Sequence, residues 1–450
     1  MVLVTIDTLR ADHLGAYGYP VATSPFLDEL AAASTLFGHA VATAPSTAPS
    51  VASLMTGLHR ASHGVWSNGG TLPARVTTLA EILRAEGFHT VARIANPLLD
   101  TRVGFAQGFD DFAMPPGLSQ QPPAILDGAP VVQEVWRLLD TIPAESRLFL
   151  WLHFYDPHGP YHPPEAYRRR FDADAYRRPG EPDLPISSGP PGLFLIPPYQ
   201  AVAGDRSPAS YRARYDAEIR YADDHVRAVV HALERHGLWD ETLFVLTADH
   251  GEALGEHGLY FQHGWFAYGD CTHVPLLVRA PGVVPRGHRV RESVSLLDVA
   301  PTILDLVGVA APDGMEGRTL RPFFAGEAVD RPAFAQSYHG TGSVALRLGT
   351  TEYVFRPARA PGSPPPAQDA AILPDEPAHE LYDLASDPHE THNLAADRPE
   401  LLADRQRRVR AWLADQHERG ARHVRGAGAE PSAPLDPVVE SQLRALGYLD

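Results

Sequence analysis

The chain has 450 residues, of which 44% are hydrophobic and 21% are charged, a composition typical of a folded globular protein. Its formal net charge of −17 argues against a surface that binds nucleic acid or an anionic membrane. A single cysteine, Cys271, excludes an intrachain disulfide and a cysteine-rich zinc site, and the sequence contains no lysine.

The first predicted element is a short apolar run, Val2–Ile6, which is typical of a buried parallel strand and has Asp7 at its carboxyl end. Because the chain opens on this strand, no secretory leader is visible. The chain as written is therefore expected to be cytoplasmic, and it would be exported if a leader preceded the given start. No apolar run approaches the roughly 18 residues that cross a bilayer, so no stable membrane insertion is expected. The sequence does not indicate an oligomeric state.

Alternating strand and helix patterns follow as far as residue ~310 and predict a mostly parallel sheet covered by helices. The predicted strands after the first are 89–95, 148–154, 243–247 and 274–278. The predicted helices are 24–34, 75–87, 131–139, 210–236 and 296–307. Two polar, Pro-rich segments, 114–130 and 163–207, are predicted as loops, and the second is long enough to suggest a functional role.

The pattern changes near Gly326, where a second region begins. Short alternating strands are predicted at 333–338, 344–348 and 353–356, a Pro-rich loop at 360–377 and a helix from Pro399 to about Arg419. This pattern predicts a smaller antiparallel sheet with one helix packed against it. We therefore expect a catalytic domain of residues 1–326 and a C-terminal α+β subdomain of residues 327–450.

A run of small hydroxyl residues, Ser46–Ser50, precedes an apolar segment that ends at Gly57. Pro49 suits the first turn of a helix and Gly57 suits its C-cap. Hydroxyl groups at a helix N-terminus lie where backbone N–H groups favour an anion. The alternative is an ordinary Ser/Thr N-cap without a further role.

Acidic or histidine-bearing turns follow three of the predicted strands, at Asp7, Asp156 and Asp249. Because the carboxyl ends of neighbouring parallel strands converge, these turns predict a site at that edge of the sheet. Asp7, Asp249 and His250, together with a hydroxyl from the helix N-terminus, would make a four-ligand metal site. Imidazole among the ligands suits Mn, Zn or Fe better than Ca. The alternative is that Asp249 and His250 cap the helix that follows.

Three loop histidines, His158, His257 and His263, lie near two of these turns. Each could bind an anionic group, protonate a leaving oxygen or complete a second metal site, although a single loop histidine is commonly a surface residue. Two arginines, Arg10 and Arg279, are interpreted as structural.

The charged residues of the longest helix are interpreted as a solvated face. They are Arg212, Glu218, Asp223, Asp224 and Arg227.

Several segments, in order along the chain, resemble the sulfatase family of the alkaline phosphatase superfamily. The first is Val-Thr-Ile-Asp-Thr-Leu-Arg-Ala-Asp-His-Leu-Gly at 4–15, and the second is Thr-x-Pro-Ser at 47–50, followed by Met-Thr-Gly at 55–57. The others lie at 63–65, 156–161, 248–258, 274–282, 297–302 and 380–394. Each segment alone is weakly specific, whereas the ordered series spans nearly the whole chain.

The resemblance implies an alkaline phosphatase-like α/β/α sandwich with a small C-terminal subdomain. It implies that Asp7, Asp249 and His250 bind one divalent metal together with residue 47, which would also be the nucleophile. His158 and His263 would lie at the substrate anion or the leaving group.

The sequence departs from the family pattern at the nucleophile. Most sulfatases have Cys or Ser at the position of Thr47, which is oxidised to formylglycine, and Arg at the position of Val51. Threonine is a secondary alcohol that would oxidise to a ketone, so no formylglycine is expected. Thr8 replaces a second acidic residue, and the anion-binding lysines of the family are absent.

These departures indicate direct attack by a Thr47 alkoxide, which forms a covalent ester that water then hydrolyses. We therefore expect a metal-dependent hydrolase of sulfate or phosphate/phosphonate esters, acting on a small-molecule, glycan or lipid ester. The chemistry favours phosphorus esters, because a sulfate ester of threonine would break down slowly, whereas the family name favours sulfate. The alternatives are a transferase of phosphoryl-linked head groups and a catalytically inactive binding protein.

Overall fold

The fold is known from a computed structural model that describes residues 1–114, 127–143, 145–188, 192–327, 329–337, 342–356 and 378–426, with side chains as far as residue 420. The predicted loop at 360–377 lies outside the described residues, as does most of the predicted loop at 114–130.

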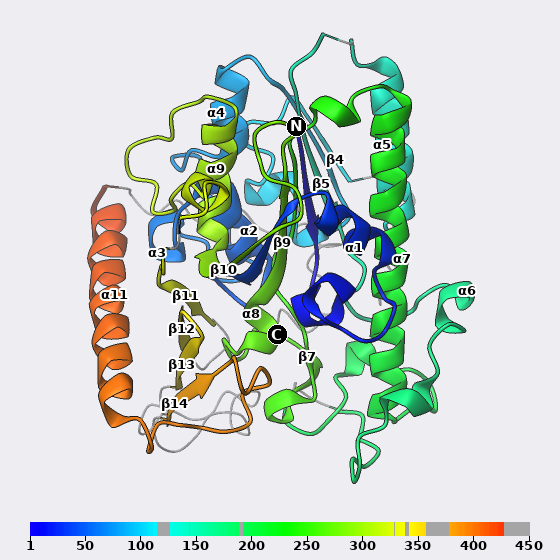
Figure 1. The fold of residues 1–450 in the computed structure, drawn as a ribbon, viewed down its shortest axis with the longest axis vertical. Helices are drawn as coiled ribbons and strands as arrows, with labels where there is room; N and C mark the ends of the chain where they lie inside the picture. Colours follow the sequence, from blue (N-terminus) through cyan, green and yellow to red (C-terminus); the bar gives the residue numbers. More distant parts are fainter. Residues whose placement is uncertain are drawn as a thin grey trace.

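An eight-stranded sheet lies at the centre of the larger part, in the order β10-β2-β9-β6-β1-β5-β3-β4 (Figure 1). Its strands are β1 Val2–Ile6, β2 Thr35–Val41, β3 His89–Ile94, β4 Asp111–Ala113, β5 Leu148–Phe154, β6 Phe244–Ala248, β9 His273–Arg279 and β10 His288–Ser295. Only β9 runs antiparallel to its neighbours β2 and β6, which confirms the mostly parallel sheet. The sequence analysis missed β2 and both edge strands: β4 is only three residues long and β10 carries four charged or imidazole side chains.

Helices cover both faces of this sheet, as expected for an α/β/α sandwich (Figure 1). On one face lie α1 Pro25–Ala32, α5 Ala129–Thr141 and α7 Pro208–Arg235, and on the other α2 Thr47–Thr56, α4 Leu79–Ala85 and α9 Val299–Leu306. The shorter helices are α3 Arg60–His63, α6 Glu165–Arg168, α8 Gly269–Thr272 and α10 Arg321–Phe324. The predicted helix at 75–87 begins only at Leu79, because Thr78 and Glu81 form a capping box there.

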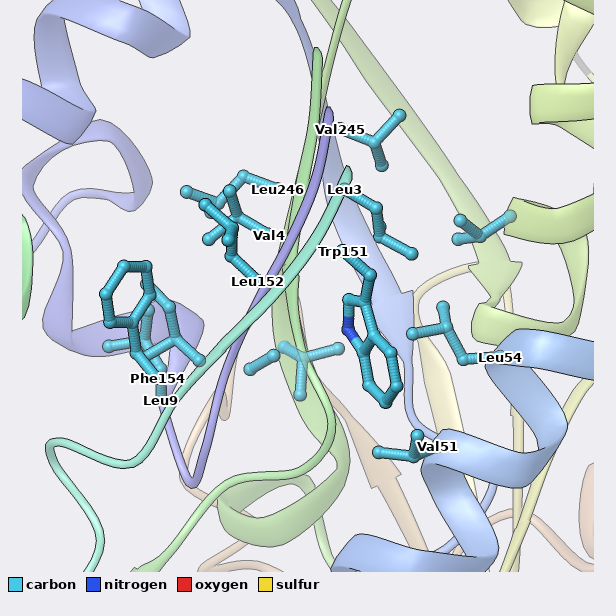
Figure 2. Close-up of a cluster of buried hydrophobic side chains, with 14 of the residues drawn as sticks. Leu3, Val4, Leu9, Val51, Leu54, Trp151, Leu152, Phe154, Val245 and Leu246 are labelled. Atoms are coloured by element: carbon cyan, nitrogen blue, oxygen red, sulfur yellow. The ribbon is translucent and has the colours of Figure 1, made fainter. Parts of the chain in front are cut away.

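The hydrophobic core joins α2 to the middle of the sheet. In Figure 2, Leu3, Trp151 and Val245 lie on the face of the sheet that packs against Val51 and Leu54 of α2. The next residue of each strand points to the opposite face, and these residues are Val4, Leu152 and Leu246. Burial of this apolar surface therefore fixes the position of α2 relative to β1, β5 and β6.

The prediction of a solvated face on α7 is wrong for three of its five residues, Arg212, Glu218 and Asp223, whereas Asp224 is half-buried and Arg227 is exposed. Arg212 and Glu218 are only 4% exposed, and Asp223 is fully buried. The Asp223 carboxylate accepts hydrogen bonds from the backbone N–H groups of Phe26 and Leu27, in the first turn of α1, at 3.1 and 2.7 Å. The helix is covered by α1 and by the segment 163–207, which contains α6 and two short 3₁₀ turns in addition to loop.

The C-terminal region forms a separate antiparallel sheet, as predicted, but it has four strands in the order β11-β12-β13-β14, and the sequence analysis missed the fourth. Its strands are β11 Ala333–Gln336, β12 Val344–Leu348, β13 Thr351–Arg356 and β14 Ala378–Asp383, and α11 Pro399–Gly426 lies beside it (Figure 1). The division of the chain at 326/327 stays a prediction. None of the helices in the described ranges is long and apolar enough to cross a membrane.

The side chain of Trp412 attaches α11 to this sheet. Its ring stacks on Phe334 with 4.7 Å between centroids and an interplanar angle of 6°, and it meets His59 edge-on at 5.2 Å. We expect Trp412→Ala to lower the free energy of unfolding of this region by about 2 kcal/mol, because it removes a half-buried aromatic contact. Amide hydrogen exchange in α11 should accelerate accordingly, whereas Trp412→Phe, which keeps an aromatic ring at the contact, should have a smaller effect. Unchanged exchange in Trp412→Ala would contradict this role.

Candidate active site

The candidate site lies where three adjacent strands end. β1 pairs in parallel with β5 and with β6, and Ile6 lies opposite both Phe154 and Ala248. The residues that follow these strands therefore emerge side by side at one edge of the sheet. Asp7 follows β1 and Asp249 follows β6, so the fold brings these two carboxylates together.

Asp7, Asp249 and His250 form a compact buried cluster. The Nε2 atom of His250 lies 3.6 Å from Asp7 Oδ1 and 3.6 Å from Asp249 Oδ2. Thr47 Oγ1 lies 3.3 Å from the same nitrogen. All four side chains are fully buried, and one ligand atom from each of the first three residues lies within 4.8 Å of the others. The four predicted metal-ligand residues are thus assembled around one point.

The ligand atoms of this cluster fit a metal ion. Asp7 Oδ1 and Asp249 Oδ2 are buried and have no hydrogen-bond partner among the described residues. The second oxygen of each carboxylate is fixed, since Asp7 Oδ2 accepts from Asn96 Nδ2 at 2.6 Å and Asp249 Oδ1 from the backbone N–H of His250 at 2.9 Å. His250 Nδ1 donates to the carbonyl oxygen of Gly251 at 2.8 Å, which leaves the lone pair on Nε2. Two carboxylate oxygens without a partner and one imidazole nitrogen, whose neighbour is the Thr47 hydroxyl, therefore face one point, as expected for metal ligands.

The negative charge of the cluster also favours a bound metal ion. Burial and the neighbouring Asp7 carboxylate raise the pKa of Asp249 well above its usual value. Two buried carboxylates this close repel each other unless one is protonated or a cation lies between them. A bound divalent cation would remove that repulsion.

Thr47 begins helix α2, and the side chain of Ser46 at the N-cap makes no capping hydrogen bond. The backbone N–H of Ala48 donates instead to Asn68 Oδ1 at 3.0 Å, and Ser50 Oγ donates to the carbonyl oxygen of Asp249 at 2.6 Å. Of the three hydroxyl groups in this stretch, that of Thr47 lies against His250. The structure therefore singles out the residue that the motif register selected.

His263 lies beside the cluster, next to the ring of His250. Its ring centroid is 4.3 Å from that of His250 and 5.1 Å from that of His158. Its Nδ1 atom lies 3.1 Å from Glu252 Oε1, and Glu252 Oε2 accepts a hydrogen bond from the Tyr161 hydroxyl at 3.0 Å. The Glu252 carboxyl thus orients the His263 ring from behind, and burial raises the pKa of this carboxyl to about 7.

His158 follows β5 and is buried. Its Nδ1 atom donates to the carbonyl oxygen of Gly159 at 2.7 Å. Burial lowers the pKa of His158 to about 4, so its imidazole is neutral near pH 7 in the protein as it stands.

Two further residues of the predicted site region lie elsewhere. His257 stacks on Tyr268, with 3.6 Å between ring centroids, and its Nε2 atom lies 3.6 Å from Glu390 Oε2, so it contacts the C-terminal region. The Asp156 carboxylate accepts a hydrogen bond from Gly128 N at 3.0 Å and does not join the cluster of Asp7 and Asp249.

The sequence analysis missed three side chains at the site. Asn96 bonds Asp7, and His153 Nε2 lies 3.5 Å from the same Asp7 oxygen. Asn68 is buried beside Thr47, and its Nδ2 atom has no hydrogen-bond partner within the described part of the chain. No spacing in the sequence marks these residues, because each belongs to a different segment and only folding brings them together.

Comparison with known proteins identifies the family. The family model named Sulfatase matches residues 1–309 of the chain. The chain belongs to the sulfatase family. The sulfatase domain thus contains Asp7, Thr47, His158, Asp249, His250 and His263, and the expected ester hydrolase family is confirmed.

Relatives of this sulfatase-family chain cover most of its length. The choline-sulfatase of Rhizobium meliloti (strain 1021) is 27% identical over 86% of the chain and 82% of that protein. The multifunctional alkaline phosphatase superfamily protein PehA of Trinickia caryophylli is 25% identical over 95% of the chain and 97% of that protein. The crystal structure of the phosphonate monoester hydrolase of Agrobacterium radiobacter has a TM-score of 0.71 at 23% identity, and covers 92% of the chain and 95% of that structure. The expected alkaline phosphatase-like fold is therefore confirmed over nearly the whole chain.

Proposed function

We propose that this sulfatase-family protein is a metal-dependent hydrolase of phosphate or phosphonate esters in which Thr47 is the nucleophile. The observation that carries the proposal is the position of Thr47 Oγ1, 3.3 Å from His250 Nε2 and next to two carboxylate oxygens without partners. A protein used only for binding has no reason to keep such a costly buried arrangement.

The metal would be held by Asp7, Asp249 and His250, with Thr47 as the fourth ligand. One imidazole and two carboxylates favour Mn²⁺ or Zn²⁺ over Ca²⁺, which prefers oxygen ligands alone. When bound, the ion would lower the pKa of the Thr47 hydroxyl and offset the charge on the oxygens of the ester.

Threonine as nucleophile is the reason for preferring phosphorus esters. Thr47 Oγ would attack phosphorus, the P–O bond to the leaving group would break, and the group would remain on Thr47 as an ester. Water can attack phosphorus in that ester and return Thr47 to its free form. A sulfate ester of a secondary alcohol is more stable, so sulfate turnover through Thr47 would stop after one cycle.

His263 is the proposed proton donor to the leaving oxygen. Glu252 accepts a hydrogen bond from Nδ1–H of its ring and so stabilises the imidazolium form, from which Nε2 can give up a proton. His158 donates its Nδ1–H to a backbone carbonyl, so it would hold the substrate anion through Nε2–H in the imidazolium form, which a bound anion favours. The substrate is proposed to be a small-molecule, glycan or lipid ester.

An ester panel tests this function. Chelator-treated protein should be assayed with p-nitrophenyl phosphate, bis(p-nitrophenyl) phosphate, p-nitrophenyl phenylphosphonate and p-nitrophenyl sulfate, before and after addition of Mn²⁺ or Zn²⁺. We expect turnover of a phosphorus ester only with metal, and a phenylphosphonyl adduct on Thr47 that mass spectrometry distinguishes from a sulfo group. Sustained turnover of the sulfate alone would contradict the preference, and turnover that survives chelation would contradict metal dependence.

Glu252→Gln tests the role of the carboxyl behind His263. The amide keeps the shape but cannot stabilise the imidazolium, so kcat should fall by about 10²-fold with little change in KM. The loss should be smaller for a substrate with a good leaving group, such as p-nitrophenyl esters, than for an alkyl ester that needs protonation. Equal losses for both substrates would indicate that Glu252 only supports the local structure.

A further inference from the structure

A second group of metal-ligand side chains lies outside the candidate active site. It consists of Asp127, just before α5, Asp156, after β5, and His225 on α7. One ligand atom from each residue lies within 4.8 Å of the others. We propose that these three residues bind a second divalent transition-metal ion, which joins α5 and α7 to the loop that carries His158.

The distances within this group suit a metal better than hydrogen bonds. His225 Nε2 lies 3.7 Å from Asp127 Oδ1 and 3.8 Å from Asp156 Oδ2. Both separations are too long for a hydrogen bond. Two ligands of a tetrahedral Zn²⁺ bonded at about 2.0–2.1 Å are about 3.4 Å apart, so a shift of a few tenths of an ångström closes the site.

His225 points independently to a ligand. His225 is only 6% exposed, and its Nε2 atom has no hydrogen-bond partner in the described part of the chain. The ring is held between Phe154, stacked at 5.7 Å with an interplanar angle of 15°, and Tyr221 at 4.1 Å. A buried imidazole that is fixed in place with a bare ring nitrogen facing two carboxylates is arranged as a metal ligand.

The two carboxylates are also fixed before any ion binds. Asp127 Oδ1 accepts hydrogen bonds from the Tyr221 hydroxyl at 2.9 Å and from the backbone N–H of Ala129 at 2.7 Å. Asp156 Oδ2 accepts from the backbone N–H of Gly128 at 3.0 Å. A Cβ atom on Gly128 would lie 2.6 Å from the His225 ring, so this close approach requires glycine. These bonds fix the direction of both carboxylates, but they engage the oxygens that face His225, so Asp127 would bind the ion by exchanging one of its two donors or through Oδ2.

Within the described residues, no arginine balances the negative charge of this group. Glu218 on α7 adds a third carboxyl, hydrogen-bonded to Asp156, and its Oε1 accepts from the backbone N–H of His162 at 2.7 Å. Across the described ranges no arginine forms an ion pair with any of these carboxyls, and the chain has no lysine. A divalent cation would balance the charge of two of the carboxylates.

One imidazole and two carboxylates favour Zn²⁺ or Mn²⁺ over Ca²⁺. The ion would connect segments that are distant in sequence, and Asp156 lies two residues before His158. Its role would therefore be to hold the loop that positions His158. This inference does not depend on the proposed nucleophile or substrate.

Metal stoichiometry tests the proposal. Chelator-treated protein is dialysed against a small excess of Zn²⁺. The number of zinc ions bound per chain is then measured by inductively coupled plasma mass spectrometry. We expect two ions in the native sequence, one in His225→Gln, one in Asp249→Asn and none in the double variant. His231→Gln is the matched control, because His231 lies on the same helix with its side chain 60% exposed, and it should keep two ions.

A structural measurement covers the case in which His225→Gln does not fold. Crystals of the native protein grown with Zn²⁺ should give an anomalous difference peak within about 2.2 Å of His225 Nε2. One ion per chain that Asp249→Asn removes, or no peak beside His225 when one is present beside His250, would overturn the second site. A peak beside His225 alone would support the second site and contradict the proposed catalytic metal, so the two proposals fail separately.

Discussion

Thr47→Val is expected to reduce kcat/KM for phosphorus esters by at least about 10⁴-fold, because valine has nearly the shape of threonine but no hydroxyl to attack. Thr47 is fully buried against His250 at the start of α2, so an isosteric residue disturbs the packing least. Steady-state assays with the preferred ester measure the effect. The covalent adduct on residue 47 should disappear with the activity.

Thr47→Ser is the matched control for this prediction. Serine keeps the hydroxyl at the helix N-terminus, and we expect activity within about tenfold of the native protein and an adduct on residue 47. Activity in Thr47→Val close to that of the native protein would mean that water attacks the ester directly and that Thr47 has another role.

Asp249→Asn is expected to cost about 10³-fold or more in kcat/KM, since charge stabilisation by a metal contributes several kcal/mol to the transition state. The free energy of unfolding of the variant should not fall along with its activity. Without metal, the variant should be as stable as the native protein or more so, because the repulsion between Asp7 and residue 249 is relieved. With metal at a hundredfold excess over Kd, the native protein should gain about 2.7 kcal/mol that the variant lacks.

Thermal unfolding with and without Mn²⁺ or Zn²⁺ measures this second effect, with the second ion site removed in both proteins by His225→Gln. Glu165→Gln is a suitable control, since Glu165 is an exposed acidic residue on α6 that forms ion pairs with the nearby Arg168 and Arg169. An Asp249→Asn variant that still gains the full metal-dependent stability would exclude Asp249 as a ligand.

Elements with strong local signals could be predicted from the sequence. β1 and β5 are predicted at the bounds that the structure gives, because each is an apolar run with a charged residue at one end, Asp7 after β1 and Arg147 before β5. Helix α2 ends at Gly57, which has φ of 66°, as its C-cap pattern indicates. β10 was missed because its charged residues belong to an edge strand, which needs no apolar run.

The charged residues of α7 show where local reasoning fails. From the sequence, Asp223 and Glu218 are interpreted as part of a solvated face, because charged residues on a long helix are usually exposed to solvent. In the fold they bond the backbone of other segments, Asp223 at the first turn of α1 and Glu218 at His162. Burial of a carboxyl is decided by what covers the helix, and the sequence of the helix does not contain that information.

The sequence by itself determined the family, through its ordered motifs, and the mostly parallel sheet. It also determined the acidic turns after β1 and β6, since the strand pattern places Asp7 and Asp249 at one edge of the sheet. Only the tertiary structure decided which side chains meet there. It brought Asn68 and Asn96 to the cluster, placed His257 against Tyr268, and directed Asp156 to His225. The reason is geometric: a strand fixes where the next residue emerges, whereas the direction of a loop side chain depends on the helices and loops packed around it.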